Sequence, residues 1–219
     1  MALNSQGVVI RRESTAVGST GVQTAADMAF VVAGNTITSP SGFANLSTGM
    51  RVKTNSPANT GAYTIKTTAA TAITVYETVS VEASGTSRTL TGHVMQAIGE
   101  VVSFNGPGIT ANVIDVTSLQ STAKEKQVGL QDPGQVSLSV LLNVETSVEV
   151  HTKLKDDMEA RTLRQFDIIF TEPTTHKGAV YFGGYVSGFG ITGAVDNVVR
   201  ADITITLSSG CDFIQPAAS

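Results

Sequence analysis

The sequence predicts a mainly β protein with one amphipathic helix, and three observations lead to this fold class. Threonine, serine, valine and glycine are abundant and tryptophan is absent, which favours strands and turns over helices. Apolar and polar residues alternate in two stretches of the second half, as in strands with one buried face. Helical spacing of apolar residues stands out in the stretch 144–161. The 219 residues suffice for one large β unit, or for a medium and a small domain.

The first 92 residues read as short strands separated by turns. Residues 7–12 predict a strand, and 13–24 a connection of small residues. Extended runs bounded by turn residues then follow one another closely, at 35–38, 50–54, 62–67, 71–75 and 88–91. These runs predict a small β-barrel or sandwich of about five strands within 22–92.

Two half-buried strands are predicted in the second half of the chain. One face of the stretch 135–142 and one face of 200–208 are apolar, formed by Val136, Leu138, Val140, Leu142, Ala201, Ile203, Ile205 and Leu207. Serine, threonine and aspartate occupy the alternate positions, so each strand has a polar face as well.

The helix predicted at 144–161 has a narrow apolar stripe. Val150, Leu154 and Met158 recur every fourth residue, while lysines and carboxylates occupy the other positions. We expect this helix to lie across the sandwich. It either caps the core of its own chain or is shared between neighbouring subunits.

A long polar loop is predicted between the strand-like runs at the two ends of 98–142. About twenty residues here lack an apolar core, and connections of that length are uncommon in compact domains unless they have a function. Asp132, Pro133 and Gly134 supply turn chemistry at the end of the loop. The polar content favours contact with another protein surface. The charged run 124–126 is either a solvated loop tip or part of that contact.

No catalytic or metal-binding constellation emerges from the residues. The stretch 188–193 matches GxGxxG, but a strand instead of a helix is expected after it, so its glycines fit a hairpin or a bulge. His93, His151 and His176 lie outside metal-ligand spacing, with His151 expected on the helix surface and His176 in a turn. The helix carboxylates Asp156, Asp157 and Glu159 are expected in solvent. We therefore predict no enzyme activity, cofactor or metal.

The charge balance argues against a nucleic-acid-binding protein. A formal net charge of −4 provides no basic surface for gripping phosphates. The single cysteine, Cys211, excludes an intrachain disulfide. Neither a signal segment nor an apolar run long enough to span a bilayer is recognised, so we expect no membrane anchor and synthesis in a cytoplasm.

Several stretches, taken in order, resemble the major tail tube proteins of long flexible-tailed bacteriophages. They cover about three fifths of the chain and comprise 101–107 (VVSFNGP), 113–121 (VIDVTSLQS), 124–126, 129–134 (GLQDPG), 161–170, 179–193 and 195–208. Residues 4–12 resemble the first strand of such proteins. In the usual pattern that strand leads almost directly to the segment found here at 97–104, whereas this chain has about seventy residues in between.

The resemblance implies a tail-tube β-sandwich domain formed by 1–21 and 93–219. The family pattern lacks 22–92, which we predict to be a small all-β inserted domain on the outer surface, because six copies in the lumen would obstruct DNA. It implies a structural virion protein of the phage tail, assembled in the host cytoplasm as stacked hexameric rings. The implied partners are further copies of the chain, a tape-measure protein, tail terminator and tail-tip proteins, and phage DNA that passes non-specifically through the lumen. The alternatives are a related tail ring or completion protein, or a β-sandwich module that binds host-surface glycans.

In this family the long loop reaches the adjacent ring. The resemblance therefore implies an inter-ring contact loop whose candidate residues are Asp115, Thr117, Ser118, Ser121, Lys124, Glu125, Lys126 and Asp132.

Overall fold

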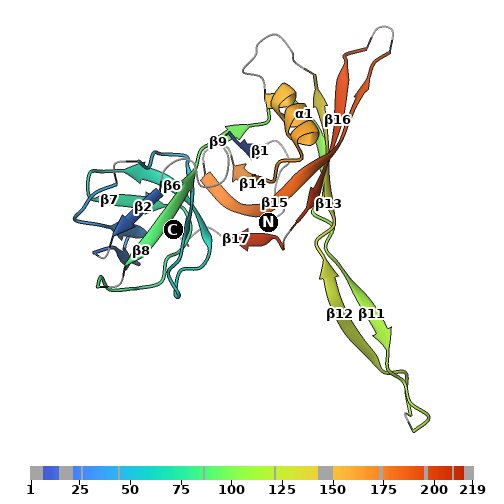
Figure 1. Cartoon of the computed structure of the whole chain (residues 1–219), viewed down its shortest axis with the longest axis horizontal. Coiled ribbons are helices and arrows are strands. Elements are labelled where there is room, and N and C mark those ends of the chain that lie inside the picture. The colour runs from blue at the N-terminus through green and yellow to red at the C-terminus, as the bar shows by residue number, and fades with distance from the viewer. Residues whose placement is uncertain are drawn as a thin grey trace. The chain divides into compact units, whose positions relative to one another are not determined.

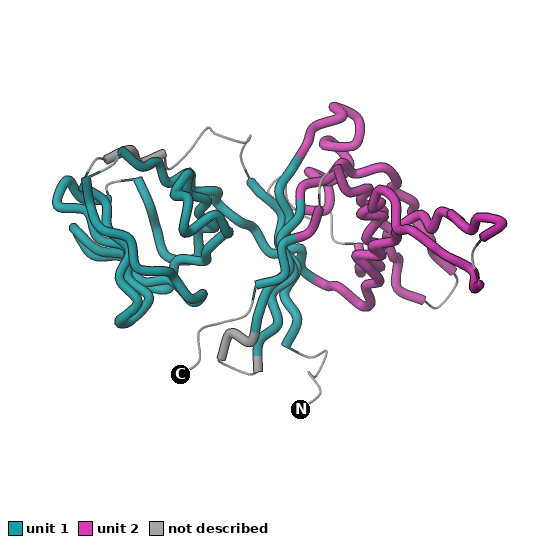
Figure 2. The backbone as a smooth tube through the Cα atoms, turned by 90° about the horizontal axis from the view of Figure 1, so that it is seen from below, with its two compact units in different colours: residues 1–99, 164–182, 212–219 teal, residues 100–163, 183–211 magenta. Residues whose placement is uncertain are grey.

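The computed structural model describes residues 7–14, 22–25, 27–43, 45–85, 87–120, 122–142, 150–172, 175–194, 197–208 and 210–214, with the backbone alone for 22–25, 172 and 175–177. These ranges contain seventeen strands and one helix (Figure 1). The chain divides into two compact units (Figure 2). Unit 1 comprises 1–99, 164–182 and 212–219, and unit 2 comprises 100–163 and 183–211.

Seven short strands of unit 1 form a sheet of their own, here called the N-terminal sheet (residues 22–93). They are β2 (Val22–Ala25), β3 (Ala29–Val31), β4 (Thr36–Thr38), β5 (Arg51–Thr54), β6 (Ala62–Thr68), β7 (Ala72–Val75) and β8 (Arg88–His93). Their order in the sheet is β2-β8-β5-β6-β7-β4-β3. The sequence predicts about five strands here, and the two that it misses, β2 and β3, have only four and three residues.

The N-terminal sheet has its own hydrophobic core. The most deeply buried members include Phe30, Ile37, Ile65, Ile73 and Leu90, each no more than 1% exposed. Burial of side chains of this size contributes about 1.5–3 kcal/mol each. This core agrees with an inserted domain at 22–92. The division into 22–92 and the remainder nevertheless stays a prediction, because the N-terminal sheet falls within the same compact unit as other strands.

The other strands of unit 1 come from distant parts of the chain. They are β1 (Val8–Glu13), β9 (Met95–Ala97), β14 (Arg164–Glu172), the first part of β15 (Thr175–Thr192) and β17 (Asp212–Ile214). β1 pairs antiparallel with both β14 and β9, and β17 pairs with β15. Ile10, Phe166 and Phe182 are buried, and the two phenylalanine rings stack with centroids 5.7 Å apart. The strand predicted at 7–12 is confirmed as β1.

The strands of unit 2 confirm the predicted alternation. β10 (Val101–Asn105), β13 (Gln135–Leu141), β16 (Arg200–Leu207) and the second part of β15 follow one another in the sheet. The apolar positions of both stretches are buried within the strands, at Val136, Leu138, Val140, Ala201, Ile203, Ile205 and Leu207. The full hydrogen-bonded path of this sheet is β10-β13-β16-β15-β14-β1-β9, so β15 contributes to both units.

The helix is α1 (Val150–Ala160), which is shorter than predicted. Residues 144–149 lie outside the described residues, and Arg161 has a φ of 52°, a left-handed conformation typical of a helix end. His151, Leu154 and Asp157 are its buried residues. The predicted solvent exposure of His151 and Asp157 is therefore wrong. These buried residues are three positions apart, whereas the apolar residues of the predicted stripe are four positions apart. The buried face of the helix is therefore rotated by about one residue from the predicted one.

The GxGxxG stretch lies at the end of β15 and continues into a connection to β16. The register between β15 and β16 shifts between Val186 and Gly188, which marks a bulge. The expectation of a bulge and a following strand is confirmed. The helix that would hold a dinucleotide is replaced by a strand.

Candidate assembly interface

An extended hairpin stands where the sequence predicts a polar loop. β11 (Thr110–Asp115) and β12 (Lys126–Asp132) form a separate two-stranded antiparallel sheet in unit 2. Figure 1 shows this hairpin continuing from the β10–β13 pair. The prediction of a loop without secondary structure is wrong. All residues of β11 and all but Gly129 of β12 are exposed, so no alternation between a buried and a solvent face marks these strands in the sequence.

Hydrogen bonds order the tip of the hairpin. The Asp115 carboxylate accepts a hydrogen bond from the backbone N–H of Thr117 at 3.0 Å, and the Thr117 hydroxyl accepts one from the N–H of Glu125 at 3.0 Å. The N–H of Val116 donates to the carbonyl of Glu125, also at 3.0 Å. The hydrogen bonds from Thr117 hold the pKa of Asp115 below its usual value. Asp115 therefore remains a carboxylate that fixes the turn.

Glycines permit the close approach of the chain at the base of the hairpin. Gly106 and Gly134 have φ values of 105° and 72°. A Cβ on Gly134 would lie 2.3 Å from the carbonyl oxygen of Gly108, and one on Gly106 would lie 2.4 Å from that of Gln135. Asp132 accepts a hydrogen bond from the Gly134 N–H at 2.9 Å, which confirms the predicted turn at 132–134.

Large apolar side chains are exposed along the hairpin and its flanks. Seven of them are more than 40% exposed, namely Ile109, Val113, Ile114, Val116, Leu119, Val128 and Leu130. Val113 and Val128 are register partners and therefore lie on one face, and Leu130 lies in the bulge that follows, where the register shifts between Val128 and Gln131. Exposed apolar groups gathered in this way are typical of protein–protein contact sites. We call the exposed side chains of Val113, Val128 and Leu130, taken together, the apolar face of the hairpin.

The structure places six of the eight predicted contact residues at the tip end of the hairpin. Asp115, Thr117, Glu125 and Lys126 lie at the tip end of the strands, with Asp115 and Lys126 in register. Ser118 and Lys124 are also exposed in the tip, and Ser121 lies outside the described residues. Asp132 pairs with Thr110 at the opposite end, about 20 Å from Lys126 along the strand. Their contact role stays a prediction.

The apolar face is the part of the site that the sequence reasoning missed. Its only signal in the sequence is the presence of valine and leucine two residues apart, at 128 and 130, within a stretch that otherwise looks polar. The outer edges of β11 and β12 have no strand partner among the described residues. An isolated two-stranded hairpin is only marginally stable in water, and free edges invite further pairing. The hairpin therefore offers exposed apolar side chains and strand edges that could be covered by another chain.

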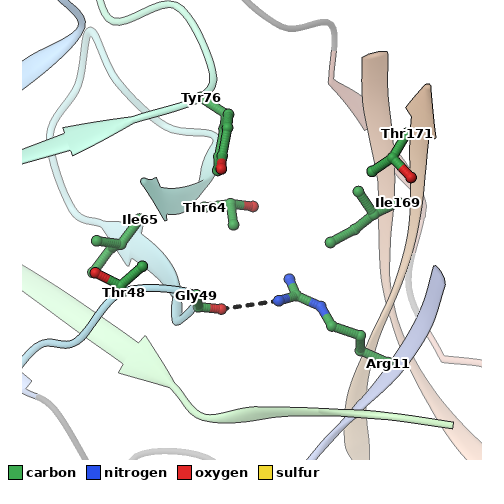
Figure 3. Close-up of a pocket in the computed structure, with 8 residues that line it drawn as sticks. All are labelled: Arg11, Thr48, Gly49, Thr64, Ile65, Tyr76, Ile169 and Thr171. Carbon is green, nitrogen blue, oxygen red and sulfur yellow. Dashed lines mark hydrogen bonds between the residues drawn. The ribbon is translucent and has the colours of Figure 1, made fainter. Parts of the chain in front are cut away.

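A pocket of about 220 Å³ in unit 1 is a weaker candidate for a functional site. Arg11, Thr64, Tyr76 and Thr171 contribute to its lining (Figure 3). Arg11 is already engaged by the Asp167 carboxylate, at 2.9 and 2.6 Å, and by the carbonyl of Gly49 at 2.9 Å. The hydroxyls of Thr64 and Thr171 bond to Tyr181 and to the carbonyl of Gly7. These polar groups are thus used internally, which favours a joint between strands over a ligand site.

The described residues contain no cluster of side chains suited to a metal ion. Among the same residues, no helix has the length and apolar character required to cross a membrane.

Comparison with known proteins gives a family match and similarities to several solved structures. Residues 80–216 match the model of the phage tail tube, lambda-like family. No curated protein matches the chain. A chain from the virion of a native gene transfer agent particle has 14% identity and a TM-score of 0.45, covering 54% of this chain and 88% of that one.

Two further solved structures show similarity. A chain of the six-fold symmetrised anti-feeding prophage baseplate has 6% identity and a TM-score of 0.45, with 56% of this chain and 84% of that chain covered. The Hcp protein has 12% identity and a TM-score of 0.29, with 55% and 77% covered. The family match alone spans more than half of the 219 residues. The chain therefore belongs to the lambda-like phage tail tube family, and it is a structural protein of a phage tail and not an enzyme.

Proposed function

We propose that copies of this chain form hexameric rings that stack into the tail tube, and that the exposed hairpin makes the contact between rings. The observation that carries the proposal is the apolar face, because Val113, Val128 and Leu130 are 55%, 65% and 92% exposed in the isolated chain. Folding of one copy leaves these side chains in water, whereas packing against the next ring buries them.

The polar residues of the hairpin give this contact its direction. The candidate contact residues include two lysines, Lys124 and Lys126, and two carboxylates, Asp115 and Glu125, at the tip end of the hairpin, and a third carboxylate, Asp132, at its base. Charged groups at the rim of an interface fix register and suppress wrong pairings more than they add affinity. Such a contact does not close on itself along the tube axis, so it propagates from ring to ring.

Lateral joining of sheets within a ring is supported by the strand order. β10 and β9 end the path of the large sheet, and neither has a further strand partner among the described residues. Edges of this kind invite strand addition from another copy. Six copies joined sideways would leave the ring without free edges.

The polar face of β13 and β16 suits a channel for DNA. Ser137 is paired with Thr204 and Ser139 with Asp202, so hydroxyls and one carboxylate share a face that has no lysine or arginine at these positions. Arg200, at the start of β16, is the one cation of the two strands on this face, so the surface offers few counterion-releasing contacts to phosphate. We propose that this face lines the lumen, first around the tape-measure protein and later around the passing genome.

The N-terminal sheet is proposed to lie on the outside of the tube as an inserted domain, 22–92, beside a tube domain formed by 1–21 and 93–219. Six copies of a domain of this size in the bore would obstruct DNA. A glycan-binding role finds little support, because Phe30, Phe43 and Tyr63 are buried in its core and unavailable as sugar platforms. Tail terminator and tail-tip proteins are the proposed partners at the ends of the tube, with assembly in the host cytoplasm.

Electron microscopy of the purified chain, together with its mass by light scattering, tests this function. Six-fold rings and tubes are the expected result. Isolated rings that never stack would instead favour a tail ring or completion protein. A chain that stays monomeric at high concentration, even with added tail-tip complex, would contradict the tube proposal.

A further inference from the structure

The N-terminal sheet contacts the β1–β14–β15 part of unit 1 through a buried interface. Its apolar portion is small and consists of Ala62 on β6 with Ile169, Ala179 and Tyr181, against which the half-buried Ile214 packs. Polar and charged side chains make further contacts across it. An interface of this composition depends on each buried polar group finding its partner.

Tyr181 on β15 is held by three residues of the N-terminal sheet. The guanidinium carbon of Arg51 lies 4.4 Å from the centroid of its ring. The Tyr181 hydroxyl donates a hydrogen bond to the Glu77 carboxylate at 2.9 Å and also bonds to the hydroxyl of Thr64. Glu77 further accepts a hydrogen bond from the backbone N–H of Thr64 at 2.7 Å. Since the phenol has one proton, it accepts from Thr64 while it donates to Glu77.

Arg51 extends the same contact to β14. Its side chain is fully buried, and Nη1 donates to the backbone carbonyl of Phe166 at 3.3 Å. A buried guanidinium that lost the ring and the carbonyl would be left without compensation, which is costly. Arginine and tyrosine are also the residue types that most often dominate the energetics of protein interfaces.

Two further polar contacts join the same elements. Arg11 on β1 pairs with Asp167 on β14 at 2.6 Å and donates to the carbonyl of Gly49, next to β5. His93 on β8 lies 2.6 Å from the Glu13 carboxylate of β1, and both side chains are buried. Arg51 and Glu77 come from the N-terminal sheet and Arg11 and Asp167 from β1 and β14, so both sides of the interface contribute a cation and a carboxylate.

We propose that Tyr181 anchors the N-terminal sheet to β14 and β15, so that the sheet is a fixed folding partner of this part of the subunit and not an independently mobile decoration. The interaction surface is the buried face of β1, β14 and β15, and its partner is the N-terminal sheet of the same chain. Every copy would then present the sheet in one orientation. This inference concerns the single chain and holds whether or not the chain forms hexameric rings.

Hydrogen exchange of the full chain tests the proposal with Tyr181→Phe, which removes only the hydroxyl. Tyr185→Phe is the matched control, because Tyr185 lies on the same strand and is 41% exposed. We expect amides of β5, β6 and β14 to exchange together, on the order of tenfold faster in Tyr181→Phe, since a lost hydrogen bond to a charged group weakens the whole contact. The control should match the wild-type chain.

Protection of β13 and β16 serves as the internal reference that each variant is folded. Faster exchange confined to β15, with β5 and β6 unchanged, would overturn the proposal, because the sheet would then not sense the loss of the anchor. A second pair of variants separates the effect of the positive charge of Arg51 from the effect of its side-chain size. Arg51→Met should speed exchange of β14 more than Arg51→Lys, which keeps a cation over the ring, and equal effects of the two would also overturn it.

Discussion

Truncation of Leu130 isolates the contribution of the hairpin to assembly from its contribution to folding. Leu130→Ala removes three carbon groups from a side chain that is 92% exposed in the single chain. If the next ring buries this side chain, the loss is about 0.8 kcal/mol per group, or about 2.4 kcal/mol per contact. At about 1.4 kcal/mol per factor of ten, the concentration needed for assembly should rise about fiftyfold.

Stability of the single chain should hardly change. An exposed leucine in water contributes little to folding, so we expect the free energy of unfolding of Leu130→Ala to stay within about 0.5 kcal/mol of the wild type. The combination of a large assembly defect and an intact fold is what distinguishes an interface residue from a core residue. Thermal unfolding of dilute protein provides the second half of the measurement.

The assay is light scattering against protein concentration, with the products viewed by electron microscopy. Val128→Ala and Val81→Ala form a matched pair, because both valines are exposed, at 65% and 73%, but only Val128 lies on the apolar face. Val128→Ala loses two groups and should raise the required concentration about fifteenfold. Assembly of both Leu130→Ala and Val128→Ala at the wild-type concentration would refute the assigned role of the hairpin.

Three further outcomes are expected. Leu138→Ala, in the buried row of β13, should lower the free energy of unfolding by about 2–5 kcal/mol by denaturant titration, and a loss as small as that of Leu130→Ala would contradict the burial pattern. Gly134→Ala should destabilise the hairpin base by about 1 kcal/mol or more, because its φ is 72° and its Cβ would meet Gly108, whereas Gly99→Ala, with open space around its Cβ, should not. Burial raises the pKa of Glu77 above its usual 4.5, so the folded chain binds the proton more tightly than the unfolded chain; this part of the stability is present at acid pH and is lost as the pH rises through the folded-state value. Glu77→Gln should flatten that slope of unfolding free energy against pH, and a slope unchanged from the wild type would exclude Glu77 as its source.

The parts of the fold that could be predicted are those with one buried face. In β13 and β16 each second residue enters the core, so burial imposes a period of two on the sequence. β11 and β12 are exposed on both faces, which removes that constraint and makes the hairpin look like a polar loop. The helix was predictable in kind, but the burial of His151 and Asp157 was not, because polar residues usually mark the solvent face.

The anchor of the N-terminal sheet was beyond prediction for a different reason. Thr64 and Glu77 are 117 and 104 residues away from Tyr181 in sequence, and nothing local to any of them indicates the contact. The candidate contact residues 115–132 could be placed because they are close in sequence and share one hairpin. The sequence analysis selected only polar and charged residues of this hairpin as contact candidates, and it did not predict that the apolar face is exposed.

The two interfaces differ in a way that bears on how the tube is built. Around Tyr181, the buried charged groups contact the ring, carbonyls and carboxylates of the same chain, with Nε of Arg51 left without a hydrogen bond, so folding of one chain forms that contact. On the hairpin, apolar groups remain in water and both strand edges are open among the described residues, so folding of one chain leaves that contact incomplete. The conformational entropy of ordering about twenty residues is of the order of 1–2 kcal/mol each, which two exposed strands do not recover by themselves. In the proposed tube, burial against the next ring should therefore stabilise the hairpin that the single chain already forms. The energy that drives stacking should reside mainly in the apolar face, while the N-terminal sheet stabilises the subunit before assembly begins.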